Sequence, residues 1–232
     1  RLGAVASPGQ WLDKAEADFR RALEIDPAHV EAHRYLSKIA AERASLLAAG
    51  GDVQGAEQAR AEAVRILEQG VAAAGSRPRS HLYLLDTQLD RVLMGDAEEE
   101  IAARLNDLEP RFLEMGRSFS ADAEVSGTTA KFFLVQALYQ GPGQRSAYLA
   151  RAIEAASKAT TLDPVKVDYA LALAELYYRR AVLLDQPADA DTARTAAQGA
   201  LDLPGAKETA GPRAYANKAN RYGICTFLAQ CA

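Results

Sequence analysis

The sequence predicts an all-α fold of about ten antiparallel helices, and three observations support this prediction. The composition is rich in Ala, Leu, Glu, Gln and Arg, which favour helices, and has few of the β-branched runs that strands prefer. Apolar residues recur at a spacing near 3.6 residues. Clusters of Gly, Pro and Asp interrupt this pattern at intervals typical of helix ends. We therefore expect almost no sheet.

Five helices are predicted in the first half of the chain. Asp26-Pro27 and Gly50-Gly51 end the first two, and Asp52 is a suitable N-cap for the third. The Gly95-Asp96 turn predicts that the fourth and fifth helices form an antiparallel hairpin. The expected helices cover residues 9–25, 28–49, 52–74, 80–94 and 96–115.

The second half begins with residues 116–128, which we expect to be looser. The helix that follows carries Phe132 and Phe133 and ends at Gly141-Pro142-Gly143. Further helices are expected at residues 144–162, 165–184, 188–203 and 212–232, with a loop at 205–211 before the last of them.

Several of these helices share a repeated spacing of small and aromatic residues. Ala15, Phe19, Ala22 and Pro27 follow the pattern Ala-x3-Phe-x2-Ala-x4-Pro, and the same spacing recurs before Pro164 with Ala in place of Phe. A second pattern has the spacing Trp-x2-Leu-Gly-x2-Tyr. It is matched by Ala170, Leu173, Ala174 and Tyr177. Tyr215, Ala219 and Tyr222 match its aromatic-x3-small-x2-aromatic positions.

The two patterns resemble the second and first helices of a tetratricopeptide repeat (TPR), in which small side chains let paired helices approach closely. This resemblance implies a right-handed solenoid whose members generally bind partners on the concave face lined by the first helix of each pair. It is good at both ends of the chain and poor between residues 37 and 145, where helix pairs take about 40 to 48 residues rather than 34. Any alanine-rich antiparallel helical array is the alternative.

We expect one TPR-like domain over residues 1–232, with two compact domains as the alternative. The resemblance makes residues 9–27 a second-helix (B-type) half repeat and residues 212–232 a first-helix (A-type) half repeat. Because a repeat unit does not bury its apolar face alone, each half repeat needs a partner or further sequence.

The first functional hypothesis is therefore a non-enzymatic structural protein that assembles head to tail through these half repeats. Such a contact gives an open filament unless the rotation between copies closes a ring. An extracellular filament is one such assembly. The residues predicted for this interface are Trp11, Phe19, Tyr215, Tyr222, Ile224, Phe227 and Leu228.

The alternative is a TPR adaptor or scaffold that binds a peptide or protein partner in its concave groove. Asn217 matches one element of the carboxylate clamp that some family members use, but Asp168 and Glu175 make the corresponding face of the 165–184 helix acidic. We therefore expect no such clamp. Arg77 and Arg79 form a basic loop that either contacts an acidic partner or is an exposed polar turn.

Composition and charge narrow the remaining classes of partner and location. A net charge of -4 and a pI near 5.5 give no attraction for phosphate backbones, so we expect no nucleic-acid partner. No run approaches the roughly 18 apolar residues of a membrane span. The sequence begins at Arg1 rather than Met, for which a cleaved export signal is one explanation. An extracellular or cell-surface location is favoured, with the periplasm or the cytoplasm as alternatives.

Cys225 and Cys231 are the two cysteines of the chain. On a continuous helix their Cα atoms would lie about 9 Å apart, too far for a disulfide. A helix break at Gly223 would allow the bond in an oxidising compartment, and two free thiols are the equal alternative.

The sequence contains no pattern that indicates an enzyme. A phosphate loop, a nucleophile elbow and a dinucleotide fingerprint are all missing, so we predict no cofactor and no catalytic residue. His29 and His33 are spaced to share a helix face, but no further Cys or His lies nearby to complete a metal site. One exposed and one packed histidine is the expected arrangement, and His81 stands alone.

Overall fold

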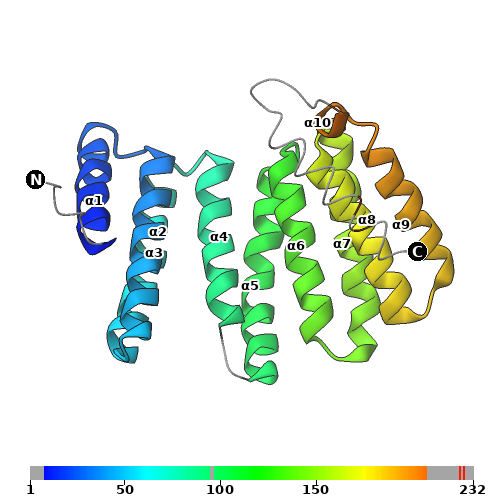
Figure 1. Ribbon diagram of the computed structural model, residues 1–232, viewed down its shortest axis with the longest axis horizontal. Helices are drawn as coiled ribbons and strands as arrows, with labels where there is room; N and C mark the ends of the chain where they lie inside the picture. Colours follow the sequence, from blue (N-terminus) through cyan, green and yellow to red (C-terminus); the bar gives the residue numbers. More distant parts are fainter. Residues whose placement is uncertain (1–7, 95–96, 208–224, 226, 228–232) are drawn as a thin grey trace, which may run out of the picture. The chain divides into compact units, whose positions relative to one another are not determined.

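The computed structural model describes residues 8–94 and 97–207, together with Cys225 and Phe227 (Figure 1). Over this part of the chain every regular element is helical, which confirms the all-α prediction. The chain divides into two compact units, Arg1–Gly95 and Asp96–Ala232. The predicted turn at Gly95-Asp96 lies outside the described residues and coincides with the boundary between the units.

The first unit is built from antiparallel helices that pack on their sequence neighbours. Its core consists of small clusters of aliphatic side chains between the second, third and fourth helices, among them Leu36, Leu67 and Leu84. The helices are α1 (Pro8–Ile25), α2 (Val30–Ala49), α3 (Val53–Ala73) and α4 (Pro78–Leu93).

The helix ends in this unit follow the turn chemistry of the sequence. Asp52 caps α3 as predicted, because its carboxylate accepts a hydrogen bond of 2.8 Å from the Gly55 N–H. Gly51, just before it, has a φ of 84°, a left-handed conformation that glycine adopts without steric cost. At the start of α2, the Nδ1 atom of His29 accepts a hydrogen bond of 3.1 Å from the Ala32 N–H and acts as the cap.

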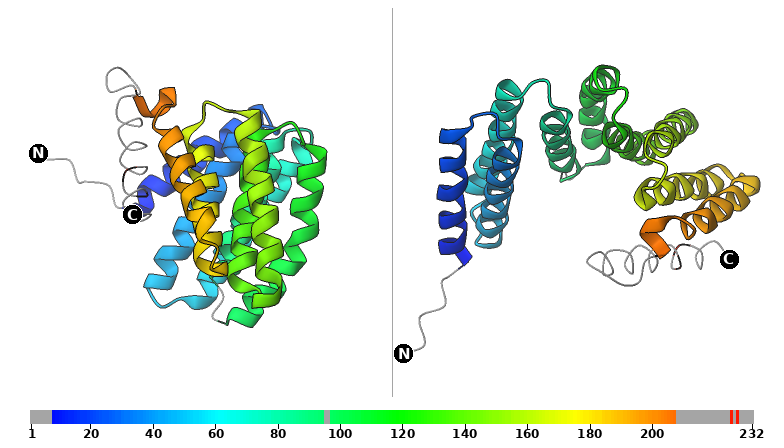
Figure 2. Two further views of the ribbon diagram at one scale, coloured as in Figure 1. Left: turned by 90° about the vertical axis from the view of Figure 1, so that its right-hand side faces the viewer. Right: turned by 90° about the horizontal axis from the view of Figure 1, so that it is seen from above.

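The second unit continues the same antiparallel arrangement, which both views of Figure 2 show for its green, yellow and orange helices. Neighbouring helices pack most closely as the pairs α6–α7 and α8–α9. The helices are α5 (Glu98–Ser118), α6 (Ala123–Tyr139), α7 (Pro142–Leu162), α8 (Val167–Leu184), α9 (Pro187–Ala200) and the short α10 (Pro204–Lys207).

Two segments differ from the sequence prediction. Residues 116–128, expected to be looser, are helical except for residues 119–122. The carboxylate of Asp122 caps α6 by accepting a hydrogen bond from the Val125 N–H at 3.0 Å. Gly127 lies inside α6, where an added Cβ would come 2.9 Å from the Tyr169 ring of α8, so glycine allows this close approach of α6 and α8.

The second difference concerns the predicted loop at residues 205–211, where residues 204–207 form α10. The last predicted helix, residues 212–232, lies outside the described residues except for Cys225 and Phe227, which are both helical.

Candidate interaction surfaces

Helix α1 packs on the rest of the first unit through one apolar side. Phe19 and Leu23 rest against a buried cluster formed by Leu36 and Ala40 of α2 and by Ala63 and Ile66 of α3. The Phe19 ring also stacks on Tyr35 of α2, with 4.9 Å between ring centroids and 12° between planes. Phe19, predicted for an interface between copies, therefore contacts its own chain.

Carboxylates of α1 meet an arginine of α2 beside this apolar contact. The Arg43 guanidinium lies 2.7 Å from Asp13 and 2.5 Å from Glu16, and Arg20 also pairs with Glu16 at 2.5 Å. Burial raises the pKa of Glu16, but the hydrogen bonds and positive charges of Arg43 and Arg20 outweigh it, so the pKa is lowered overall. Ionised Glu16 therefore helps to hold α1 against α2.

A second side of α1 remains exposed and carries large apolar side chains. Trp11 is 60% exposed and Ile25 is 82% exposed. They are nearly four helical turns apart and so lie on one side of α1, with the half-buried Ala15 and Ala22 between them. We call these four residues the Trp11–Ile25 face. Asp18 lies on the same stripe and Lys14 borders it on the side of Ile25, and both charged side chains are exposed.

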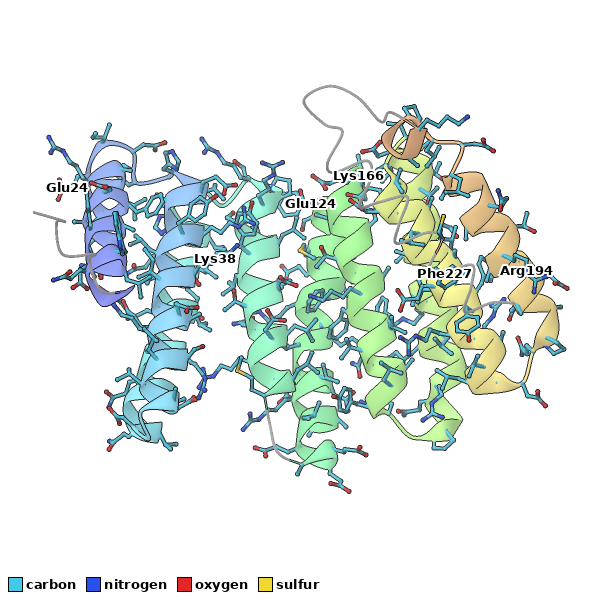
Figure 3. The ribbon with its side chains drawn as sticks, in the orientation of Figure 1. Glu24, Lys38, Glu124, Lys166, Arg194 and Phe227 are labelled. Atoms are coloured by element: carbon cyan, nitrogen blue, oxygen red, sulfur yellow. The ribbon has the colours of Figure 1, made fainter. Side chains whose placement is uncertain are left out.

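A different surface of the first unit combines aromatic rings with positive charge. The Arg34 guanidinium lies over the Tyr83 ring of α4, 4.6 Å from its centroid, and 5.7 Å from that of Tyr35. Glu31 fixes the positions of both side chains. Its carboxylate forms an ion pair with Arg34 at 3.1 Å and accepts a hydrogen bond of 2.7 Å from the Tyr83 hydroxyl. Lys38 is exposed one turn further along α2 (Figure 3). We call Arg34, Tyr35, Lys38 and Tyr83 the cationic surface.

The Tyr83 hydroxyl is strongly perturbed by this environment. Burial and the hydrogen bond to the Glu31 carboxylate raise the pKa of Tyr83 to about 12, although Arg34 acts in the opposite direction. Tyr83 therefore stays neutral and donates to Glu31 at physiological pH. The hydroxyl positions the carboxylate that orients Arg34.

The basic turn identified in the sequence is partly used within the first unit. Arg77 donates a hydrogen bond of 3.1 Å to the Ala28 carbonyl and so ties the α3–α4 turn to the α1–α2 turn. Arg79 lies 4.0 Å from Glu31, at the edge of the cationic surface.

In the second unit, Phe227 packs against its own chain. Its side chain is only 9% exposed and meets the Tyr178 ring of α8 edge-on, 5.7 Å between centroids and 79° between planes (Figure 3). The surrounding cluster consists of small side chains from α8, α9 and α10. Its buried members are Val167, Ala174, Ala193, Ala197, Ala200 and Ala206.

The remaining predicted interface and disulfide residues are placed only in part. Tyr215, Tyr222, Ile224 and Leu228 lie outside the described residues, as do Cys231 and Asn217. Cys225 is exposed and free. The structure thus puts Trp11 on an exposed face, packs Phe19 and Phe227 within their own units, and does not test the rest.

Sequence reasoning missed a buried polar network between α5, α6 and α7. Gln136 of α6 is fully buried, and its side-chain amide donates a hydrogen bond of 3.2 Å to the Leu105 carbonyl of α5. The Glu109 carboxylate accepts hydrogen bonds from the Arg151 guanidinium at 2.6 Å and from the Tyr148 hydroxyl at 3.2 Å. These partners are 31 to 42 residues apart along the chain, so no local pattern indicates their contact. The one local signal is Pro110, which sits inside α5.

His29 and His33 both make contacts within the first unit that stabilise the fold. His29 is exposed and caps α2, whereas His33 is buried, as the sequence predicts for the pair. The His33 ring lies 2.9 Å from the Pro27 carbonyl and 3.1 Å from the Ile66 carbonyl. Within residues 8–94, 97–207, 225 and 227, no three His, Cys, Asp or Glu side chains are grouped so as to hold a metal ion.

None of the helices that the structure describes combines the length and the apolarity needed to cross a bilayer. Their architecture, antiparallel helix pairs that pack on their neighbours, is that of a helical-repeat protein.

Comparison with known proteins agrees with this class. No family model and no curated protein matches the chain. The solved structure of TTC0263, a thermophilic TPR protein from Thermus thermophilus, matches with a TM-score of 0.59 and 16% identity over 92% of this chain and 91% of that one. The protein therefore has a TPR-like helical repeat fold.

Two further TPR-type structures are similar at lower scores. MamA is 16% identical, covers 82% of this chain and 87% of its own, and has a TM-score of 0.44. The TPR protein YrrB is 14% identical, covers 92% and 90%, and has a TM-score of 0.39.

Proposed function

We propose that this protein is a non-enzymatic interaction scaffold that assembles head to tail, with the Trp11–Ile25 face of one copy receiving the C-terminal half repeat of the next. One observation supports this proposal. Trp11 and Ile25 are exposed on one side of α1, whereas α1 packs on α2 and α3 through a different side, which carries Phe19 and Leu23. An apolar stripe on a repeat helix is suited to a further helix of the same kind.

The size of this contact sets the expected behaviour of the assembly. Burying a tryptophan or isoleucine side chain contributes about 1.5–3 kcal/mol each, so the Trp11–Ile25 face alone supports only weak association. Assembly is therefore concentration dependent. Because the contact joins two different surfaces, it extends into an open filament unless the rotation closes a ring. An extracellular or cell-surface filament is the form that we propose.

The single tryptophan of the chain makes the proposal directly measurable. Trp11 is exposed in the isolated subunit and becomes covered when a neighbour docks. We expect its fluorescence emission to shift to shorter wavelength as the concentration rises, in parallel with the mass measured by light scattering. A constant emission maximum at increasing mass would place the contact elsewhere, and a constant monomer mass would exclude self-assembly.

A charge placed on the same face should prevent assembly without unfolding the subunit. Ile25→Glu alters a side chain that is 82% exposed, so the circular dichroism of the monomer should not change. We expect this variant to remain monomeric at concentrations at which the parent assembles. Val182→Glu is the matched control, because Val182 is an exposed apolar residue of α8 in the other unit and its replacement should leave assembly intact.

A second candidate function is an adaptor that binds a peptide or protein on the first helix of each pair. The cationic surface favours this candidate, because it combines aromatic rings with positive charge on α2 and α4. A fluorescent peptide of alternating Glu and Leu residues is a suitable probe. Binding should be lost in Lys38→Glu and kept in Lys158→Glu, an exposed lysine of α7. Equal binding by both variants would argue against the cationic surface as the site.

A further inference from the structure

His33 of α2 is a buried ionisable side chain whose two ring nitrogens both face hydrogen-bond acceptors. The residue is 6% exposed. Its Nε2 atom lies 2.9 Å from the Pro27 carbonyl oxygen in the α1–α2 turn, and its Nδ1 atom lies 3.1 Å from the Ile66 carbonyl oxygen of α3. A carbonyl oxygen only accepts, and a neutral imidazole has a single N–H, whereas an imidazolium has two. The imidazolium form therefore satisfies both contacts, and the neutral form satisfies only one.

The packing around the ring makes this double contact possible. Gly70 follows Ile66 by one turn of α3, and the His33 ring lies where the side chain of a larger residue would begin. The ring therefore reaches the backbone of α3 on one side and the α1–α2 turn on the other. Because Pro27 and Ile66 belong to different elements, His33 forms a bridge between these elements.

Charged groups of both signs lie on the elements around this bridge. They are Glu24 of α1, Asp26 and His29 of the α1–α2 turn, Glu62 of α3, and Arg77 and His81 beside the start of α4. On α2 itself, Glu31 and Arg34 belong to the cationic surface. Carboxylates favour a positive charge on the ring, whereas Arg77, which donates to the Ala28 carbonyl, opposes it. Two charge-assisted hydrogen bonds offset the cost of burying that charge.

We propose that His33 is a proton-dependent clamp, whose imidazolium form holds the α1–α2 turn against α3 and whose neutral form releases the Pro27 carbonyl. The Pro27 contact is the one released because it is only partly buried, so water can replace the lost donor, whereas the Ile66 contact is buried. This clamp lies within the first unit and does not depend on self-assembly or on peptide binding.

The protons of the ring can be followed without altering His33. In the double variant His29→Asn, His81→Gln, His33 is the only histidine of the chain, and asparagine still caps α2. In nitrogen-15 NMR spectra we expect a proton on both ring nitrogens at about pH 5.5 and on Nδ1 alone at about pH 8, across the range in which histidines change charge. An unchanged number of ring protons would overturn the clamp. Loss of the Nδ1 proton instead of the Nε2 proton would overturn the assignment of Pro27 as the released contact.

Hydrogen exchange tests whether this proton holds the turn. The protection of the amides of residues 28–33, corrected for the intrinsic exchange rate at each pH, should be about two- to tenfold higher at about pH 5.5 than at about pH 8, which is the effect of one net hydrogen bond. His33→Gln, whose side chain does not titrate, should lose this pH dependence. The α7–α8 turn, residues 163–166, contains no histidine and is the internal control. Equal pH dependence in the parent and in His33→Gln, or in both turns of the parent, would overturn the inference.

Discussion

At the scale of single residues, several side chains derive their properties from one or two contacts. Tyr83 is the strongest case, because its hydroxyl is partly buried and donates to the Glu31 carboxylate. Asp185 is another, because it ends α8 in a left-handed conformation, with a φ of 51°, that glycine adopts more easily.

Tyr83 should ionise at about pH 12, well above the ordinary tyrosine value of about 10. Because this pKa is raised in the folded state, its contribution to stability is complete below pH 10 and is lost as the pH rises towards 12. Glu31→Gln should lower the pKa of Tyr83, since it removes the carboxylate that favours the protonated hydroxyl. Ultraviolet difference titration of the parent against Tyr83→Phe isolates this residue. Glu24→Gln, at an exposed position of α1, should leave the titration unchanged.

Asp185→Gly should stabilise the second unit by up to about 1 kcal/mol, because it relieves a left-handed conformation that is unfavourable for residues with a Cβ. The gain is reduced by the greater freedom of glycine in the unfolded chain. Urea denaturation followed by circular dichroism measures it. Asp163→Gly, at the end of α7 with a φ of -135°, has no such conformation to relieve and should not stabilise the protein. Equal effects of both variants would contradict this explanation.

At the scale of helices, the contact between α1 and α2 combines an apolar side with a carboxylate–arginine cluster. It determines how the Trp11–Ile25 face is presented. In the second unit, Gln136 of α6 and Gln140 at the C-terminal end of α6 donate hydrogen bonds to the Leu105 and Ala102 carbonyls of α5.

Acid should loosen α1 from α2. The pKa of Glu16 is lowered in the folded state, so its contribution is present above the ordinary glutamate value and is lost as the pH falls through the folded value. The protection of the α1 amides, corrected for the intrinsic exchange rate at each pH, should therefore fall between pH 5 and pH 3 by more in the parent than in Arg43→Gln, which has already lost one of the two arginine partners of Glu16. Glu154→Gln, an exposed residue of α7, is the control and should show the parent response.

Local patterns predicted most of the helices but few of the contacts between them. The N-cap role of Asp52 involves only residues 52–55, so the sequence alone was sufficient to predict it. The helical start of α6 within residues 116–128 was not predicted, and the close approach of Gly127 to Tyr169, 42 residues later, is a contact that no local pattern indicates. The packing of Phe227 against its own unit was missed for the same reason, since its alanine-rich surroundings are an ordinary helix composition until α8 and α9 are paired.

At the scale of the whole molecule, the protein is moderately acidic, with a net charge of -4, yet its candidate surfaces differ in character. The Trp11–Ile25 face is mainly apolar, whereas the cationic surface depends on Arg34 and Lys38. Salt screens the second kind of contact far more than the first.

The two proposed activities should therefore respond differently to ionic strength. Between about 0.05 M and 0.5 M salt, the concentration at which the protein assembles should change little, because burial of Trp11 and Ile25 is not electrostatic. Binding of the acidic peptide should weaken over the same range. Sedimentation velocity and fluorescence anisotropy on one preparation measure both. Assembly that dissolves at high salt would indicate that charged groups, not the Trp11–Ile25 face, hold the copies together.

The close approach of Gly70 to His33 has a consequence for the presentation of α1. An added Cβ at Gly70 would lie 2.9 Å from the His33 ring, and that ring also meets the Pro27 carbonyl in the turn from which α1 departs. A single methyl group on α3 would therefore displace the imidazole and disturb its contact with the Pro27 carbonyl in the α1–α2 turn. If the proposed self-assembly holds, Gly70→Ala on α3 would alter it although Gly70 is not part of the Trp11–Ile25 face.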